Sequence, residues 1–254
     1  MPELISDHTD SRIKKFLGLK GIDKDEYIIG EGFKIVEKMN SVLEVTELLT
    51  SESIYNENPS FFENISGKIY LAENKFISDH VGYKFHQGVF AIASHPGYRA
   101  LDTINGETLV LNNLDNAENV GAIIRSATGL GFKNILMDMR SCSPFLKRSI
   151  RVSMGNVFFA NLFRVKSLIE SFELMKKKGY QILSAANEEG AVDYRSIVKK
   201  NSNIAVIIGN EGNGIEENIK KASTGLIKIP VLENVEHINA AAAGAILMSE
   251  YSPN

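Results

Sequence analysis

Three stretches in the second half of the chain combine glycine with asparagine, arginine and glutamate, residue types that can surround a nucleotide. The first runs from Asn119 to Arg125 (NVGAIIR), and the second from Gly209 to Gly214 (GNEGNG). The third begins at Ile229, continues through a proline and ends in HINAAAAGAILM. Glycine lets a backbone approach a ligand closely, and asparagine and arginine supply hydrogen-bond donors. A nucleotide or a phosphate is therefore the first hypothesis for these stretches.

The glycine-rich stretch differs from the common phosphate-binding loops. Its glycines are in the wrong order for a dinucleotide fingerprint, and it lacks the Gly-Lys-Ser/Thr ending of a P-loop. Phosphates bind to amide donors and positive charge, so the Glu211 carboxylate favours a ligand with donor groups or positive charge. Each of the three stretches also has a plain structural alternative: a capped surface helix, a glycine-rich turn and a buried alanine-rich helix.

The elements expected around these stretches form a parallel sheet. Short apolar strands alternate with helices from residue 108 onward, which is typical of an α/β sheet covered on both faces. We expect strands at residues 108–112, 134–137, 180–185, 204–208 and 225–229, and helices at 120–130, 167–178, 215–222 and 237–251, with one more helix beginning near Ser143 and Pro144. Asn119 is expected to cap the helix at 120–130. Ligands of such sheets bind beyond the carboxyl ends of the strands.

The first hundred residues predict a smaller mixed α/β unit. Strands are expected at residues 27–29, 42–49, 68–71 and 88–93, and helices within 10–20 and at 32–39. Residues 95–107 contain proline and glycine without periodicity and indicate a linker.

The composition is that of an ordinary soluble globular protein of 254 residues. The net charge of −3 does not by itself point to nucleic acid. However, only basic charges occur between Asp138 and Glu170, and a local cationic patch of this kind can attract phosphates. A solvated surface of mixed charge is the alternative. The single cysteine, the absence of an apolar N-terminal segment and the lack of a run of ~20 apolar residues favour the cytoplasm.

Taken together, the three stretches resemble the motifs of the SpoU (TrmH-like) family of RNA 2′-O-ribose methyltransferases, in the SPOUT superfamily. The family motifs are N-x-G-x-x-x-R, G-N-E-x-x-G, and I-P-M followed by S-L-N and a helix of small residues. Residues 151–155 (RVSMG) also look like the R-A-S-M-G stretch of the family. The matching positions are Asn119, Gly121 and Arg125 in the first motif, Gly209, Asn210, Glu211 and Gly214 in the second, and Ile229, Pro230, Ile238 and Asn239 in the third.

This resemblance, which covers residues 106–251, implies a methyltransferase domain at 107–254 with a C-terminal trefoil knot. A knot is an exception to the usual rule that chains do not thread loops. The implied cofactor is S-adenosylmethionine, bent within the knot and held mostly by backbone groups. The implied cofactor-binding residues are Gly209, Asn210, Gly214, Ile229, Val231 and Ile238. Family members are usually homodimers, in which Arg125 can serve the cofactor of the partner.

The resemblance extends to the N-terminal part. Residues 1–95 look like an L30e-like domain that binds the RNA substrate, joined by a linker at 96–106. The cues are the sequences SRIKKFLGLK at 11–20, GEG at 30–32 and HQG at 86–88. The basic residues expected to contact RNA are Arg12, Lys14, Lys15, Arg148 and Arg151. Because these contacts go to phosphates, binding of structured RNA should weaken steeply with salt.

The implied reaction is in-line attack of a ribose 2′-hydroxyl on the sulfonium methyl group, without a metal. Arg125 is either the base or the group that binds the adjacent phosphate. An arginine has a pKa above ~12, so phosphate binding is the physically safer role. Asn119 and Asn239 would position the ribose and the knot loops. Glu211 would order the neighbouring loops or the arginine.

Two positions depart from the family pattern. Asn116-Ala117 replaces Asp-Pro before the first motif, which alters the stiffness of a turn. His237 replaces the serine of S-L-N, beside the expected ribose. This histidine can line the pocket for a different nucleotide, act as the base, or mark an impaired site.

Two other functions remain as alternatives. The chain can be a catalytically inactive relative that binds RNA or the cofactor, a reading that His237 supports. A nucleotide-dependent oxidoreductase would need a glycine fingerprint after its first strand and an acid about twenty residues further on, and neither is in place. The sequence does not separate ribosomal from transfer RNA.

Overall fold

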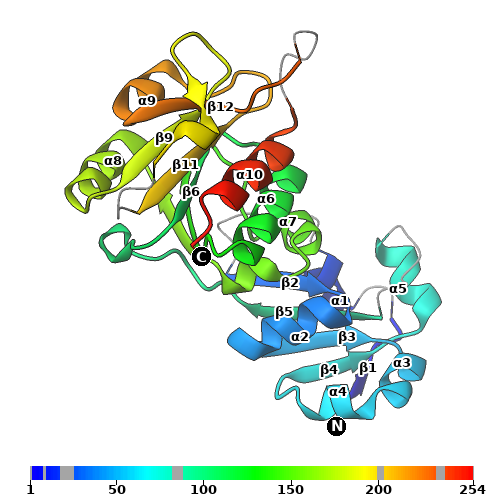
Figure 1. The fold of residues 1–254 in the computed structure, drawn as a ribbon. Coiled ribbons are helices and arrows are strands. Elements are labelled where there is room, and N and C mark those ends of the chain that lie inside the picture. The colour runs from blue at the N-terminus through cyan, green and yellow to red at the C-terminus, as the bar shows by residue number, and fades with distance from the viewer. Residues whose placement is uncertain are drawn as a thin grey trace. The chain divides into compact units, whose positions relative to one another are not determined.

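The chain folds into two compact units, each built on its own sheet (Figure 1). The computed structural model describes residues 2–7, 10–17, 26–81, 88–198, 203–232 and 238–253. The first unit comprises Met1–Pro96 and Phe145–Phe158, and the second comprises Gly97–Pro144 and Phe159–Asn254. One stretch from the middle of the sequence therefore packs with the N-terminal residues.

The first unit has a mixed sheet of five strands. In spatial order the strands are β1 (Glu3–Leu4), β4 (Lys68–Leu71), β3 (Val45–Thr50), β5 (Val89–Ser94) and β2 (Tyr27–Glu31). The first three are parallel, and β5 runs antiparallel to both of its neighbours.

Helices cover both faces of this sheet. On one face, Phe16 of α1 (Ser11–Leu17) and Ile77 of α5 (Asn74–Val81) join a buried cluster with residues of β2, β3 and β5. On the other face, α2 (Phe33–Val42) places Met39 against Gly30 of β2. The short helices α3 (Glu52–Glu57) and α4 (Pro59–Glu63) follow β3.

Helix α7 (Lys147–Val152) belongs to the first unit. The helix expected to begin near Ser143 and Pro144 begins at Lys147 instead, so that prediction is wrong. Phe145 is buried and meets the ring of His95 with 4.5 Å between centroids, and this packing outweighs the capping signal of Ser143. The short helix η2 (Asn156–Phe159) comes next.

The second unit has a parallel sheet of seven strands, which confirms the predicted α/β class. Its spatial order is β10 (Val192–Asp193), β12 (Gly225–Lys228), β9 (Gln181–Ala185), β11 (Ile204–Gly209), β6 (Thr108–Asn112), β7 (Asn134–Asp138) and β8 (Asn161–Val165). The central strand β11 is buried from residue 204 to 208, as expected for a sheet covered on both faces.

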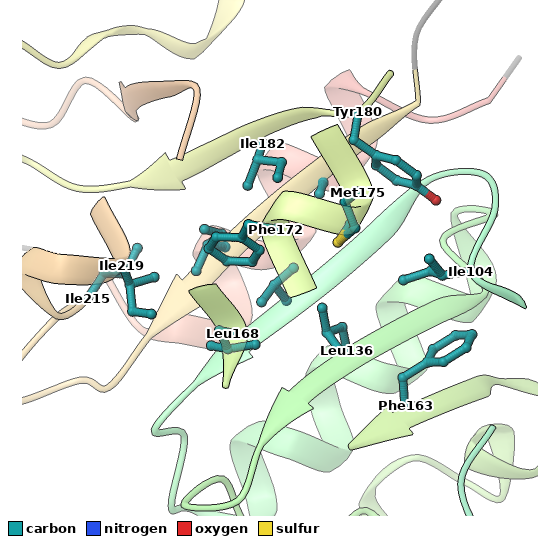
Figure 2. Packing of buried hydrophobic residues seen from close by; sticks show 13 residues of the cluster. Ile104, Leu136, Phe163, Leu168, Phe172, Met175, Tyr180, Ile182, Ile215 and Ile219 are labelled. Atoms are coloured by element: carbon teal, nitrogen blue, oxygen red, sulfur yellow. The ribbon is translucent and has the colours of Figure 1, made fainter. Parts of the chain in front are cut away.

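Helices cover both faces of this sheet (Figure 1). Helices α8 (Leu168–Lys177) and α9 (Glu217–Ala222) pack on one face. Figure 2 shows Phe172 and Met175 of α8 in the buried cluster beneath them. Helices α6 (Ala117–Gly129) and α10 (Ala240–Glu250) pack together on the other face, where α10 also contacts β11. The short helices η1 (Leu101–Thr103) and η3 (Tyr194–Ser196) lie in connections.

Within the described ranges, no helix has the length and the apolar character needed to cross a membrane.

Candidate functional site

A pocket of about 320 Å³ lies in the second unit, at the carboxyl ends of β9, β11 and β12. This is the edge at which parallel α/β sheets bind their ligands. The structure brings to it all six residues expected to hold a cofactor: Gly209, Asn210, Gly214, Ile229, Val231 and Ile238. Residues more than twenty positions apart in the sequence thus line one cavity.

The glycine-rich loop is held in shape by Asn210. Its Oδ1 accepts hydrogen bonds from the amide of Gly212 at 2.9 Å and from the next amide at 3.2 Å. Its backbone forms a two-bond bridge with Gly214, at 3.1 and 2.9 Å. Its Nδ2 donates to the carbonyl oxygen of Asn113 at 3.0 Å and to Oδ1 of Asp115 at 3.2 Å. Asn210 therefore closes the loop and ties it to the segment after β6.

Glycine is required at position 209. A Cβ there would lie 2.5 Å from the backbone carbon and oxygen of Gly214 and 2.7 Å from the side chain of Ile215. Real Cβ atoms do not approach backbone atoms so closely, so the bridge that closes the loop leaves no space for a side chain. Gly214 has φ +66°, in the left-handed region that favours glycine.

Glu211 binds the start of helix α10. Its Oε1 accepts from Nδ2 of Asn239 at 2.5 Å and from the amide of Ala240 at 3.4 Å. Asn239 is the N-cap of the helix, since its Oδ1 accepts from the amides of Ala241 and Ala242 at 2.9 and 3.3 Å. A carboxylate near a helix N-terminus is also favoured by the helix dipole. These contacts join the second and third motif stretches, and α10 accordingly begins three residues later than expected.

Asn119 and Arg125 lie on α6 but differ in environment. Asn119 is buried, its Oδ1 accepts from Asn239 at 3.2 Å, and its Nδ2 has no partner among the described residues. The sequence predicts that Asn119 caps this helix, and that prediction is wrong. The N-cap is Asn116, whose side chain accepts from the amide of Glu118 at 2.8 Å. Arg125 is exposed, and its side chain makes no hydrogen bond or ion pair within the described ranges, to Glu211 or to any other group. Its guanidinium is therefore available to a ligand.

His237 lies outside the described residues, which resume at Ile238. Ile238 lines the pocket, so His237, which departs from the family pattern, directly precedes a pocket residue in the sequence.

The N-terminal basic residues expected to contact RNA are partly engaged with carboxylates. Arg12 pairs with Asp10 at 2.5 Å and with Glu3 at 2.8 Å. The hydrogen bonds from Arg12 lower the pKa of Asp10 to about 2. Lys15 pairs with Glu47 at 2.7 Å. Lys14 is exposed and has no such partner in the part of the chain that the structure describes.

The remaining two, Arg148 and Arg151, are on α7, exposed and half-buried respectively. They belong to the same compact unit as the N-terminal basic residues.

Sequence reasoning missed an ion pair in the wall of the pocket. Lys220 Nζ contacts Oε2 of Glu188 at 2.5 Å and Oε2 of Glu217 at 2.9 Å. These hydrogen bonds, the one to Glu188 foremost, raise the pKa of Lys220. Glu188 and Lys220 line the pocket. The available signal was the position of Glu188 just after a predicted strand, at the ligand-binding edge of the sheet.

Sequence reasoning also missed the support beneath the loop after β6. The buried Asp138 accepts from Nδ2 of Asn112 at 3.1 Å, from the amide of Asn113 at 2.8 Å and from the amide of Ser141 at 2.7 Å. Asn112 in turn accepts from the amide of Glu216 at 3.1 Å. This network fixes the ends of two strands relative to the glycine-rich loop.

No group of three or more histidine, cysteine, aspartate or glutamate side chains that could hold a metal occurs within the described ranges.

Comparisons with known proteins show the family and the fold of this chain. The model of the SpoU rRNA Methylase family matches residues 107–249. An uncharacterized tRNA/rRNA methyltransferase of Mycobacterium tuberculosis is 24% identical over 97% of this chain and 90% of its own length.

Two crystal structures share the fold. One is an AdoMet-bound rRNA methyltransferase from Sinorhizobium meliloti, with 23% identity, a TM-score of 0.85, and coverage of 98% of this chain and 96% of the other. The other is the SpoU methyltransferase AviRb from Streptomyces viridochromogenes in complex with AdoMet, with 18% identity, a TM-score of 0.83 and coverage of 95% and 96%. Since the family model matches more than half of its length, the chain belongs to the SpoU rRNA methylase family, a family of RNA methyltransferases.

Proposed function

We propose that the protein transfers a methyl group from S-adenosylmethionine to a ribose 2′-hydroxyl of ribosomal or transfer RNA. The observation that carries this proposal is the pocket that unites the second and third motif stretches, tied through Asn239 to Asn119 of the first. The exposed Arg125 on the same helix as Asn119 adds a group for the RNA.

The pocket suits the proposed cofactor. Its volume of about 320 Å³ is within the usual range for small-molecule sites. Apolar side chains, among them Ile208, Ile229 and Ile238, offer walls for a purine. The Glu211 carboxylate favours donor groups or positive charge, as a sulfonium carries. When bound, S-adenosylmethionine supplies an already activated methyl group. The two structural neighbours solved with AdoMet support this assignment.

The chain's own residues would bind and align the RNA. Arg125 holds the phosphate next to the reacting ribose, because a guanidinium matches a phosphate with two parallel hydrogen bonds. Asn119 and Asn239 position the ribose. Alignment of this kind accounts for much of the rate in reactions whose partners are already activated. For His237 the three alternatives stay open: it lines the pocket, it acts as the base, or it marks an impaired site.

The first unit is proposed to bind the RNA substrate, as an L30e-like domain. Arg148 and Arg151 support this proposal. Both lie on α7, which packs with the N-terminal residues, so the first unit gains the positive charge of these two arginines. The proposed domains are the L30e-like domain at 1–95, a linker at 96–106 and the methyltransferase domain at 107–254. We place the reaction in the cytoplasm.

The trefoil knot and the homodimer are also proposals. The segment between β12 and α10 carries Ile229, Val231 and Ile238 to the pocket of the glycine-rich loop, which suits a knotted connection. Helix α10 consists almost entirely of apolar residues, yet Ala242 and Ile246 are exposed, which suits a face covered by a second copy.

The test is methyl transfer from radiolabelled S-adenosylmethionine to unmodified ribosomal and transfer RNA. The expected product carries the label on a ribose 2′-oxygen, which makes the adjacent phosphodiester resistant to alkali. Label on a base would contradict ribose methylation. Binding of S-adenosylhomocysteine without transfer to either RNA would favour the inactive relative.

A further inference from the structure

One carboxylate in the pocket wall has no role in the proposed mechanism. Glu188 lies three residues after the end of β9, at the edge of the sheet where the pocket opens, and is half-buried. Its neighbour Glu189 is exposed and does not line the pocket. The two adjacent acids therefore differ in their access to a bound ligand.

Lys220 fixes one oxygen of this carboxylate and leaves the other open. Oε2 of Glu188 receives the Lys220 ammonium at 2.5 Å, whereas Oε1 accepts no hydrogen bond from a described residue. Lys220 also contacts Glu217 at 2.9 Å, and its side chain is only 14% exposed. Lys221 also contacts Glu217, at 3.7 Å, so the two carboxylates and two ammonium groups carry no net charge. The open Oε1 of Glu188 can only accept a hydrogen bond, so it suits a donor group rather than an anion.

We propose that Glu188 accepts hydrogen bonds from the ribose hydroxyls of the adenosine part of the cofactor, with Lys220 as the positioning residue that orients it. This inference rests on the proposed function. An acid that follows a strand of a parallel sheet and binds a ribose is a solution known from dinucleotide-binding sheets. A neutral hydroxyl can donate to Oε1 without adding a third positive charge beside the Lys220 and Lys221 ammonium groups.

The test is calorimetric binding of S-adenosylhomocysteine to the full-length protein and to Glu188→Ala. A lost charge-assisted hydrogen bond weakens binding on the order of tenfold to a hundredfold. Glu188→Gln retains an acceptor oxygen and should lose less affinity. Glu189→Ala, the matched control for charge and position, should bind as the original protein does.

The 2′,3′-dideoxy analogue of S-adenosylhomocysteine identifies the group that Glu188 contacts. This analogue should bind with the same affinity to the original protein and to Glu188→Ala. Lys220→Met should weaken the binding of S-adenosylhomocysteine more than the binding of the analogue, since the lysine acts through the Glu188 carboxylate. A Glu188→Ala effect of equal size on both ligands would overturn the ribose contact.

The same titrations separate this inference from the proposed function. If the unaltered, folded protein does not bind S-adenosylhomocysteine, the cofactor assignment fails, and the inference fails with it. If the protein binds the ligand and Glu188→Ala binds it equally well, only the inference fails. Because RNA is absent from the titration, the hydroxyls that are measured belong to the cofactor. Thermal unfolding of each variant shows that it is folded, and Glu188→Gln preserves the test if the alanine variant is not.

Discussion

The amino group of Asn239 donates to Glu211 Oε1 at 2.5 Å and also lies 3.2 Å from Oδ1 of Asn119. One Nδ2 atom thus joins the glycine-rich loop, helix α6 and the start of helix α10. The glutamate in the middle of the loop therefore has a structural role: Glu211 accepts a hydrogen bond from Asn239, the residue that caps helix α10. The tie holds the two sides of the pocket together and does not require that a ligand be bound.

Replacement of Asn239 separates its two roles, capping and tying. Asn239→Ser retains a capping oxygen but loses the donor, and we expect it to lower the free energy of unfolding by about 1 kcal/mol. Asn239→Asp also retains a capping oxygen but places a second carboxylate beside Glu211. It should be the less stable variant at pH 7, by a further ~1 kcal/mol or more. Urea unfolding measures both.

The control for the added charge is Asn213→Asp, in the same loop. The side chain of Asn213 is exposed and makes no hydrogen bond to a described residue, so this variant should change stability by less than about 0.5 kcal/mol. Equal stability of Asn239→Asp and Asn239→Ser would mean that Glu211 is not held close to position 239 in solution.

Much of the sheet in the second unit could be predicted from the sequence. The strand at 108–112 is found with the predicted bounds, because its apolar run is flanked by polar and glycine-containing turns. Residues 68–71 of the first unit behave in the same way. In both cases local composition and tertiary environment favour the same state. The predicted start of α7 failed because burial of Phe145 opposes a local capping signal.

The gathering of the motif residues around one pocket was predictable from the sequence, whereas the side-chain pairs in the pocket wall were not. All six expected cofactor positions line the pocket, because the loops that carry them follow strands of one parallel sheet. The contact between Glu188 and Lys220 joins residues 32 positions apart, and no local pattern reports it. The packing of Phe145–Phe158 with the N-terminal residues is likewise a tertiary property.

Gly209→Ala should damage the pocket directly. The added Cβ would lie 2.5 Å from the backbone of Gly214, so the loop must shift. We expect a loss of stability of about 1–3 kcal/mol and a loss of affinity for S-adenosylhomocysteine of at least tenfold.

Gly212→Ala is the matched control in the same loop. Its Cβ would meet only Oδ1 of Asn210, at 3.4 Å, an ordinary contact. Calorimetry and urea unfolding of the two variants measure the difference. If Gly209→Ala binds the ligand as tightly as the original protein does, the tight bridge does not shape the cofactor site.

Arg125→Ala should reduce methyl transfer without affecting the fold. The side chain is exposed and unpaired within the described ranges, so the free energy of unfolding should change by less than about 0.5 kcal/mol. Affinity for S-adenosylhomocysteine should not change. Arg125→Lys should recover only part of the activity, because lysine cannot bind a phosphate with two parallel hydrogen bonds. Single-turnover transfer to RNA is the measurement, and a wild-type rate in Arg125→Ala would remove Arg125 from the mechanism.

Tyr98 should make the second unit less stable at alkaline pH. Burial raises the pKa of Tyr98 from 10.0 to about 12, because the phenolate would lose its hydration. The unfolded chain releases this proton near pH ~10 and the folded chain retains it. The free energy of unfolding is therefore unaffected by this group below pH ~10. It falls as pH rises toward 12, by up to about 1.4 kcal/mol per pH unit.

Tyr98→Phe removes the titrating group and reveals its contribution. The variant also loses the hydrogen bond that Arg164 donates to the Tyr98 hydroxyl at 3.2 Å, so it should be about 1 kcal/mol less stable at pH 8. Between pH 10 and 11 its stability should fall less than that of the original protein. The buried Tyr180 and Tyr251 also have raised pKa values, but they titrate in both proteins and cancel in the difference. Parallel stability curves in urea over this interval would show that Tyr98 titrates alike in the folded and unfolded chains.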